Sequence, residues 1–207
     1  MQKFYYLLLL SWLITACNAS GPADNSAPAA PSTNNASYED VSIDDYTVEN
    51  VPGTNWQKAT KVDTAGNIAE VGYFENGKRV GSWVTFHQGK LFPAQLSNYK
   101  NGKLNGLHMQ FNQGGQTEVI AYYQDNNLHG QWAKFRFSRV LEEAEYKYGK
   151  LDGTYRAYNL QDGKLQKTAE YKNGVQDGYY RTFDSDGNMT TEYLYRNGQQ
   201  ISGGATR

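Results

Sequence analysis

The sequence predicts an all-β protein, an elongated antiparallel β-meander built from tandem β-hairpin repeats. A tight-turn pattern centred on Asn-Gly recurs at a nearly constant spacing, and aromatic residues hold fixed positions on both sides of each turn. The composition combines 17 tyrosines and 21 glycines in 207 residues with a mean hydropathy of -0.75. This mixture favours a thin sheet with aromatic rows over a thick core, because a tyrosine hydroxyl can stay in water.

The first segment, residues 1–16 (MQKFYYLLLLSWLITA), has the layout of a secretory signal peptide. One lysine precedes an apolar run that is shorter than the about 20 residues needed to span a bilayer. The run ends in Ile14-Thr15-Ala16-Cys17, which resembles the lipobox of bacterial lipoproteins. The resemblance implies cleavage before Cys17, attachment of acyl chains such as palmitate to that cysteine, and anchoring in the cell envelope. Asn18 favours the outer membrane, because an aspartate at this position favours inner-membrane retention in that family.

Residues 17–55 are predicted to form a flexible acidic tether that begins with the lipidated cysteine. Residues 18–37 are nearly all Ala, Ser, Asn and Pro, so they offer little apolar burial to offset the entropy of ordering. The acidic segment 38–50 is open to two interpretations, a linker or a strand that docks on the sheet. The repeat domain is predicted to occupy residues 56–207, with residues 56–72 as a degenerate cap.

From residue 73 onward, one pattern recurs: aromatic-x-Asn-Gly-Lys-x-x-Gly-x-aromatic-x-x-aromatic. Its turn positions are separated by 25, 24, 23, 25 and 24 residues. Each unit therefore reads as strand, turn, strand, turn, and a truncated sixth copy starts at Tyr195. The five full copies are FENGKRVGSWVTF (74–86), YKNGKLNGLHMQF (99–111), YQDNNLHGQWAKF (123–135), YKYGKLDGTYRAY (146–158) and YKNGVQDGYYRTF (171–183).

Two columns of turn residues explain the glycine content. Asn-Gly between extended segments favours a type I′ turn, in which both central residues need positive φ, and asparagine is the non-glycine residue that best tolerates this region. The first column comprises Gly77, Gly102, Asn126, Gly149, Gly174 and Gly198. A second column lies four residues later and predicts permissive geometry or close backbone approach; it comprises Gly81, Gly106, Gly130, Gly153 and Gly178.

Three aromatic columns accompany these turns. The column three residues before the turn holds Phe74, Tyr99, Tyr123, Tyr146, Tyr171 and Tyr195. Six residues after the turn, with His108 as the exception, stand the candidate binding aromatics Trp83, Trp132, Tyr155 and Tyr180. Nine residues after it stand Phe86, Phe111, Phe135, Tyr158 and Phe183. The last two columns are three residues apart, so either both faces of the sheet carry aromatic rows or a bulge intervenes.

The repeat resembles the MORN repeat, in the variant form found in bacterial proteins that are often described as antitoxin-like. The resemblance covers roughly residues 66–203 and rests on five copies in register. It implies an elongated antiparallel β-meander that acts as a scaffold, as a protein-binding module or, in some eukaryotic members, as a lipid-associated module. It implies no catalytic residues. The sequence departs from the pattern at His108, at Asp125-Asn126 and in the sixth copy, where Gly203 falls one residue late.

Charge and motif content predict no enzyme activity, no metal, no cofactor and no nucleic acid partner. The formal net charge is only -1, which gives no electrostatic case for nucleic acid. Asp184–Asn188 lacks the spacing of a calcium loop and reads as a β-turn. Asp152 and Asp177 share one repeat position and are predicted to be solvated turn residues rather than a catalytic pair. A shared zinc site is not expected for the histidines, which occupy three different repeat positions: His87, His108 and His129.

The resulting hypothesis is a non-enzymatic, envelope-anchored lipoprotein that acts as a protein-binding scaffold. Its partners would be the membrane, through the N-terminal lipid, and a protein whose identity the sequence leaves open. One alternative is neutralisation of a toxin in the periplasm or at the surface. Another is binding of carbohydrate or peptidoglycan, with the aromatic columns as stacking platforms.

Overall fold

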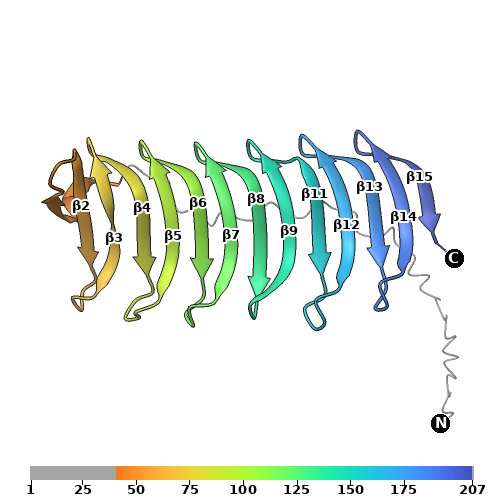
Figure 1. Ribbon diagram of the computed structural model, residues 1–207, viewed down its shortest axis with the longest axis horizontal. Coiled ribbons are helices and arrows are strands. Elements are labelled where there is room, and N and C mark those ends of the chain that lie inside the picture. The colour runs from red at the N-terminus through yellow and green to blue at the C-terminus, as the bar shows by residue number, and fades with distance from the viewer. Residues whose placement is uncertain (1–40, 207) are drawn as a thin grey trace, which may run out of the picture. The chain divides into compact units, whose positions relative to one another are not determined.

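The computed structural model describes residues 41–206, which form one open antiparallel sheet (Figure 1). The 15-stranded sheet follows chain order from β1 to β15, with β10 as a short side strand paired with β9. In residues 41–206 no helical segment is long and apolar enough to cross a membrane. The predicted all-β meander is therefore confirmed. The elements are η1 (Ile43–Asp45), β1 (Thr47–Asn50), β2 (Trp56–Val62), β3 (Ile68–Glu75), β4 (Lys78–Phe86), β5 (Pro93–Lys100), β6 (Lys103–Phe111), β7 (Thr117–Gln124), β8 (Asn127–Arg136), β9 (Arg139–Lys147), β10 (Lys150–Leu151), β11 (Gly153–Tyr158), β12 (Leu165–Lys172), β13 (Val175–Phe183), β14 (Met189–Arg196) and β15 (Gln199–Ala205).

The sheet begins earlier than the sequence predicted. β1 pairs with β2, with Val48 opposite Ala59, and the 3-10 turn η1 brings Tyr46 onto the first repeat. The ring of Tyr46 lies edge-on to Phe74 at 5.4 Å between centroids. The prediction of a flexible tether over residues 17–55 is thus wrong from residue 41 onward, and the docking alternative describes residues 41–50. The apolar alternation in residues 41–50 is too short to predict from the sequence that this segment pairs with another strand.

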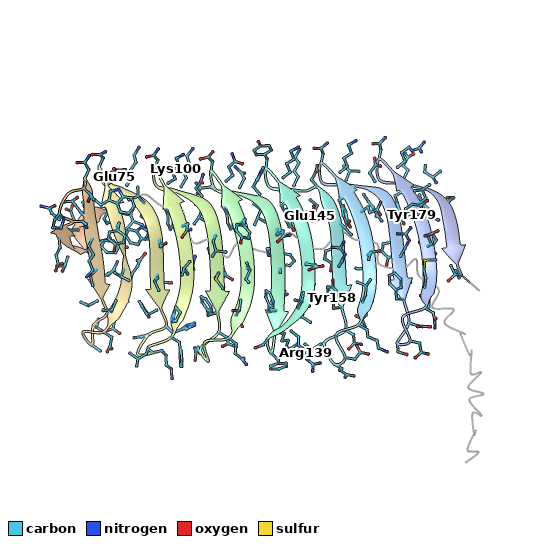
Figure 2. The ribbon with its side chains drawn as sticks, viewed as in Figure 1. Glu75, Lys100, Arg139, Glu145, Tyr158 and Tyr179 are labelled. Atoms are coloured by element: carbon cyan, nitrogen blue, oxygen red, sulfur yellow. The ribbon has the colours of Figure 1, made fainter. Side chains whose placement is uncertain are left out.

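The hairpins turn at the predicted Asn-Gly positions and their equivalents. Both central residues of each have positive φ, for example 52° at Asn101 and 80° at Gly102, as a type I′ turn requires. The truncated sixth copy also forms a complete hairpin, β14–β15. A further pair at the opposite edge, Phe137 (φ 50°) and Ser138 (φ 60°), makes a tight turn that the sequence did not predict. Figure 2 shows Lys100 at the Asn-Gly edge of the sheet and Arg139 at the other.

The second glycine column lies where the register shifts. Opposite Ser97 and Tyr99, β6 contributes His108 and Leu104, so more residues lie between them on β6 than on β5. Gly106 sits in this bulge with a φ of 107°. At Gly178 (φ 125°), a Cβ would also lie 2.7 Å from the Cβ of Glu170. Both predicted reasons for glycine, permissive backbone and close approach, therefore operate in this column.

The sixth copy corrects one alignment. The register pairs Gly203 with Tyr193, and the corresponding pair one repeat earlier is Tyr180 with Ala169. Gly203 therefore occupies the position of the large aromatic, six residues after the turn in the other copies. It is not a late member of the second glycine column, because one residue is missing from β15 before it.

Candidate functional site

The inner face of the sheet carries the aromatic column six residues after the turn. We define this face by Trp83, Trp132, Tyr155 and Tyr180, which are 2%, 4%, 4% and 6% exposed. Trp132 lies between the small residues Ala121 and Ala144 of the neighbouring strands. Tyr180 has a small neighbour, Ala169, on one side only, and lies opposite Tyr193 on the other. A ring needs lateral room at a strand spacing of about 4.8 Å, and the small neighbours provide it.

The burial of these four aromatics revises their assigned role. They were candidate binding residues, but rings that are at least nine-tenths buried stabilise the sheet and offer no face for a partner. Repetition of an aromatic reveals a ladder, and it does not reveal whether the ladder faces solvent. The binding surface must therefore be sought elsewhere.

His108 takes the place of an aromatic in this ladder. Gln95 donates to Ser97 Oγ at 3.0 Å, and Ser97 Oγ lies 3.0 Å from His108 Nδ1. This chain of hydrogen bonds suits a neutral imidazole that accepts at Nδ1. Burial lowers the pKa of His108 to about 4. The side chain is 5% exposed, so it fills the core.

Acid should therefore destabilise the sheet through His108. Its pKa falls from 6.5 in the unfolded chain to about 4 in the sheet, so between these values only the unfolded chain binds the proton and stability falls as the pH falls. We expect a loss of about 2 kcal/mol between about pH 7.5 and about pH 5. Urea unfolding at both pH values measures it, with His108→Tyr as the control that keeps a ring and removes the titration. Equal pH slopes for the two proteins would contradict this account.

The first repeat contains a polar network that the sequence did not reveal. Arg79 stands where the next three copies have leucine. Its Nη2 donates to Glu70 Oε1 at 2.7 Å and to the hydroxyl of Tyr46 at 3.1 Å. The guanidinium also lies 4.6 Å from the ring centroid of Trp83. Burial, followed by the hydrogen bond to Glu70, raises the pKa of Tyr46 to about 12. The network fixes Tyr46 over the end of the core, against which Val41 and Ile43 also pack.

The outer face carries the most distinctive surface of the described chain. A row of cross-strand neighbours over β3–β8 is entirely apolar, and each member is partly exposed. Five spacings of about 4.8 Å make this apolar row about 24 Å long. The members, paired strand by strand, are Val71, Val84, Leu96, Met109, Ile120 and Ala133.

The same row changes character beyond β8. It continues from Ala133 to Glu143, then to Arg156, and Arg156 Nη1 lies 3.3 Å from Glu143 Oε1. Further on, Arg181 Nε lies 2.6 Å from Glu192 Oε2. The charged side chains of the row beyond β8 thus form ion pairs with one another. The apolar part of the row, over β3–β8, is not covered by any other strand of residues 41–206.

Aromatic side chains border the apolar row on the same face. Tyr122 is 42% exposed and lies opposite Leu107. Trp56 is 36% exposed, and its ring centroid lies 5.5 Å from that of Tyr73. We use the name outer patch for the apolar row together with its neighbours Trp56, Tyr73, Leu107 and Tyr122.

In the fourth copy the two aromatic columns after the turn lie on opposite faces, and the register between β11 and β12 also shifts between Ala157 and Tyr158. Tyr155 donates to Glu142 at 2.9 Å and Tyr158 donates to Glu143 at 2.7 Å. Consecutive strand residues point to opposite faces, so the two tyrosines do as well.

The histidines and aspartates singled out in the sequence do not form a common site in the structure. Nε2 of His87 lies 3.0 Å from the carbonyl oxygen of Phe111, and His129 packs on Tyr148 with ring centroids 4.7 Å apart. Within residues 41–206 no group of acidic, histidine or cysteine side chains could hold a metal ion. Asp152 and Asp177 accept hydrogen bonds from the next turn, and Asp184 does so within its own turn. Cys17 lies outside the described residues.

Comparison with known proteins gives little further information. No protein-family model and no curated protein matches the chain. Similar solved structures include a mutant of S. aureus TarM in complex with fondaparinux, alpha-GlcNAc-glycerol and UDP, at 10% identity and a TM-score of 0.24, covering 77% of this chain and 21% of that one. Another crystal structure of TarM gives 13% identity and a TM-score of 0.24, with 64% and 22% covered. The chain spans about a fifth of TarM, and likeness at this level carries no functional argument.

Proposed function

We propose that this chain is a non-enzymatic, lipid-anchored envelope protein that binds another protein through the outer patch. The observation that carries the proposal is the apolar row over β3–β8, which gives way to self-paired charges on the same face. Contiguous exposed apolar surface rimmed by polar residues marks interaction sites in soluble proteins. The protein-binding role of MORN-like arrays, to which we assign this chain, agrees with it.

The composition of the outer patch favours a protein partner over a sugar. Tryptophan and tyrosine border aliphatic side chains, and such clusters dominate binding energy at protein interfaces. A carbohydrate binder would need accessible ring faces, and the regular aromatic ladder is buried. Cys17 is the proposed lipid acceptor and would hold the patch at the membrane through residues 18–40.

Site-specific photocrosslinking in cells tests this function. A photoreactive amino acid at Leu96 or Ile120 should yield an adduct of one common mass. The same group at Thr168, in the charged half of the same row, should not. Leu96→Asp should reduce the adduct formed from position 120 by about tenfold or more, because it places an unpaired charge in an apolar contact.

The anchor is tested in parallel. Cys17→Ser should abolish labelling by a clickable fatty acid and release the protein from the membrane fraction. Adducts from position 168 as strong as those from 96 and 120 would count against the outer patch, and unchanged lipid labelling of Cys17→Ser would count against the anchor.

A further inference from the structure

The last strand, β15, forms the end of the described sheet and differs from the other end. At the N-terminal end, β1 has only 4 residues and the ring of Tyr46 closes the core against Phe74 and Trp83. β15 has 7 residues, Gln199–Ala205, without a charge or a proline. Within residues 41–206 no strand pairs with its far side. Charges and proline usually protect an edge strand from pairing with another chain. β15 has neither, so its edge is open to pairing.

The inner face of β15 has an empty place in the aromatic ladder. In earlier repeats large rings alternate with small residues, as Tyr155 does with Ala169. At this end the order is reversed, because Tyr193 stands where alanine stood and Gly203 stands where the ring stood. Tyr193 thus forms a wall beside a strand that carries no side chain at that position.

The other end of the sheet shows what fills such a place. Gly72 on β3 is covered by the indole of the next strand, so closely that a Cβ at Gly72 would lie within 2.5 Å of three ring atoms of Trp83. That indole is 2% exposed. At Gly72 the absence of a side chain thus makes room for a large ring from the adjacent strand. At Gly203, where φ is 111°, a Cβ would instead meet the β14 backbone at Glu192 and Tyr193, so this position must also lack a side chain, and no further strand of the described chain lies beside it.

We propose that β15 accepts an extended segment of a partner protein as an added antiparallel strand, with an aromatic side chain that lies over Gly203 against Tyr193. The inference rests on the proposed protein-binding function and names a second contact on a different surface. The free edge of β15 supplies the backbone hydrogen bonds, and the place over Gly203 supplies the side-chain preference, as in other strand-addition complexes. A second copy of β15 fits less well, because its own Gly203 brings no ring.

Hydrogen exchange with model peptides tests this site in the full-length protein held in mild detergent. The probe is an alternating Thr/Val peptide of the length of β15 with one central tryptophan, and its matched control has alanine at the centre. The tryptophan peptide should slow exchange in residues 199–205 and leave β1 and β2 unchanged. The alanine peptide should bind about tenfold more weakly or worse, because the buried ring supplies most of the apolar contact.

Variants separate this contact from the outer patch. Tyr193→Ala removes the wall, and Gln200→Lys adds a charge on the exposed edge without removing core packing; each should weaken the tryptophan peptide about tenfold. Tyr122→Ala, on the outer patch, should have no effect. Equal affinity of the two peptides, protection at β1–β2, or dimerisation through β15 would overturn the proposal. Failure of the crosslinks at positions 96 and 120 would instead overturn the outer patch and leave the peptide result standing.

Discussion

Replacing Trp132 with alanine is expected to lower the free energy of unfolding by about 3–5 kcal/mol. The indole is 4% exposed and covers the small side chains of Ala121 and Ala144 on both neighbouring strands. It also meets Tyr146 edge-on, with 6.4 Å between ring centroids. Because both neighbours are alanine, no side chain can move in to fill the space, so most of the cavity should persist.

Tyr122→Ala is the matched control. It removes a ring from the strand next to Trp132, but on the outer face, where Tyr122 is 42% exposed. We expect a loss below about 1 kcal/mol. Urea unfolding followed by circular dichroism gives both values. Comparable losses for the two variants would show that the ladder is not the stabilising core.

Valine at Gly178 is expected to cost about 4 kcal/mol, from two separate causes. A φ of 125° is a backbone conformation that a β-branched residue rarely adopts. A Cβ would also lie 2.7 Å from the Cβ of Glu170 on the adjacent strand, so the strands must separate.

Two further glycines separate the contribution of backbone strain from that of the close contact. At Gly174 the φ is 85° and the nearest atom to a Cβ is 3.6 Å away, so Gly174→Val should cost about 2 kcal/mol from backbone strain alone. At Gly204 nothing lies within 4 Å of a Cβ and φ is not positive, so Gly204→Val should be nearly neutral. Thermal melts of the three variants give the ranking. Equal melting temperatures would refute both the turn geometry and the close approach.

The hairpin array could be predicted from the sequence because its causes are local. Asn-Gly pairs need positive φ wherever they occur, and their spacing sets the strand length and the alternation of directions. The second glycine column could be located in the same way, although its place in a bulge became visible only from the register of the strands. The prediction for Gly203 was wrong, because β15 has one residue fewer before it and that glycine occupies the aromatic column.

The candidate site could be predicted only in part. The columns of large aromatics attracted attention as binding residues, yet the outer patch consists of aliphatic positions that also recur, such as Leu96 and Ile120. The members of the apolar row stand six residues before and seven residues after the turns of the first three copies, so the sequence does contain a signal for them. The network of Tyr46, Glu70 and Arg79 had no such pattern, since its members come from separate segments and occur once.

The sequence by itself thus determined the strands, their turns and their order, because backbone chemistry and side-chain period act within a few residues. Only the tertiary structure decided which face is buried. The sequence of an alternating strand is the same whichever of its two faces is buried. The choice depends on residues of the adjacent strands, such as Ala121 and Ala144 on either side of Trp132. Trp83 and Trp132 pack over small residues of adjacent strands and become core, while Val84 and Ala133, one position further along the same strands, remain at the surface.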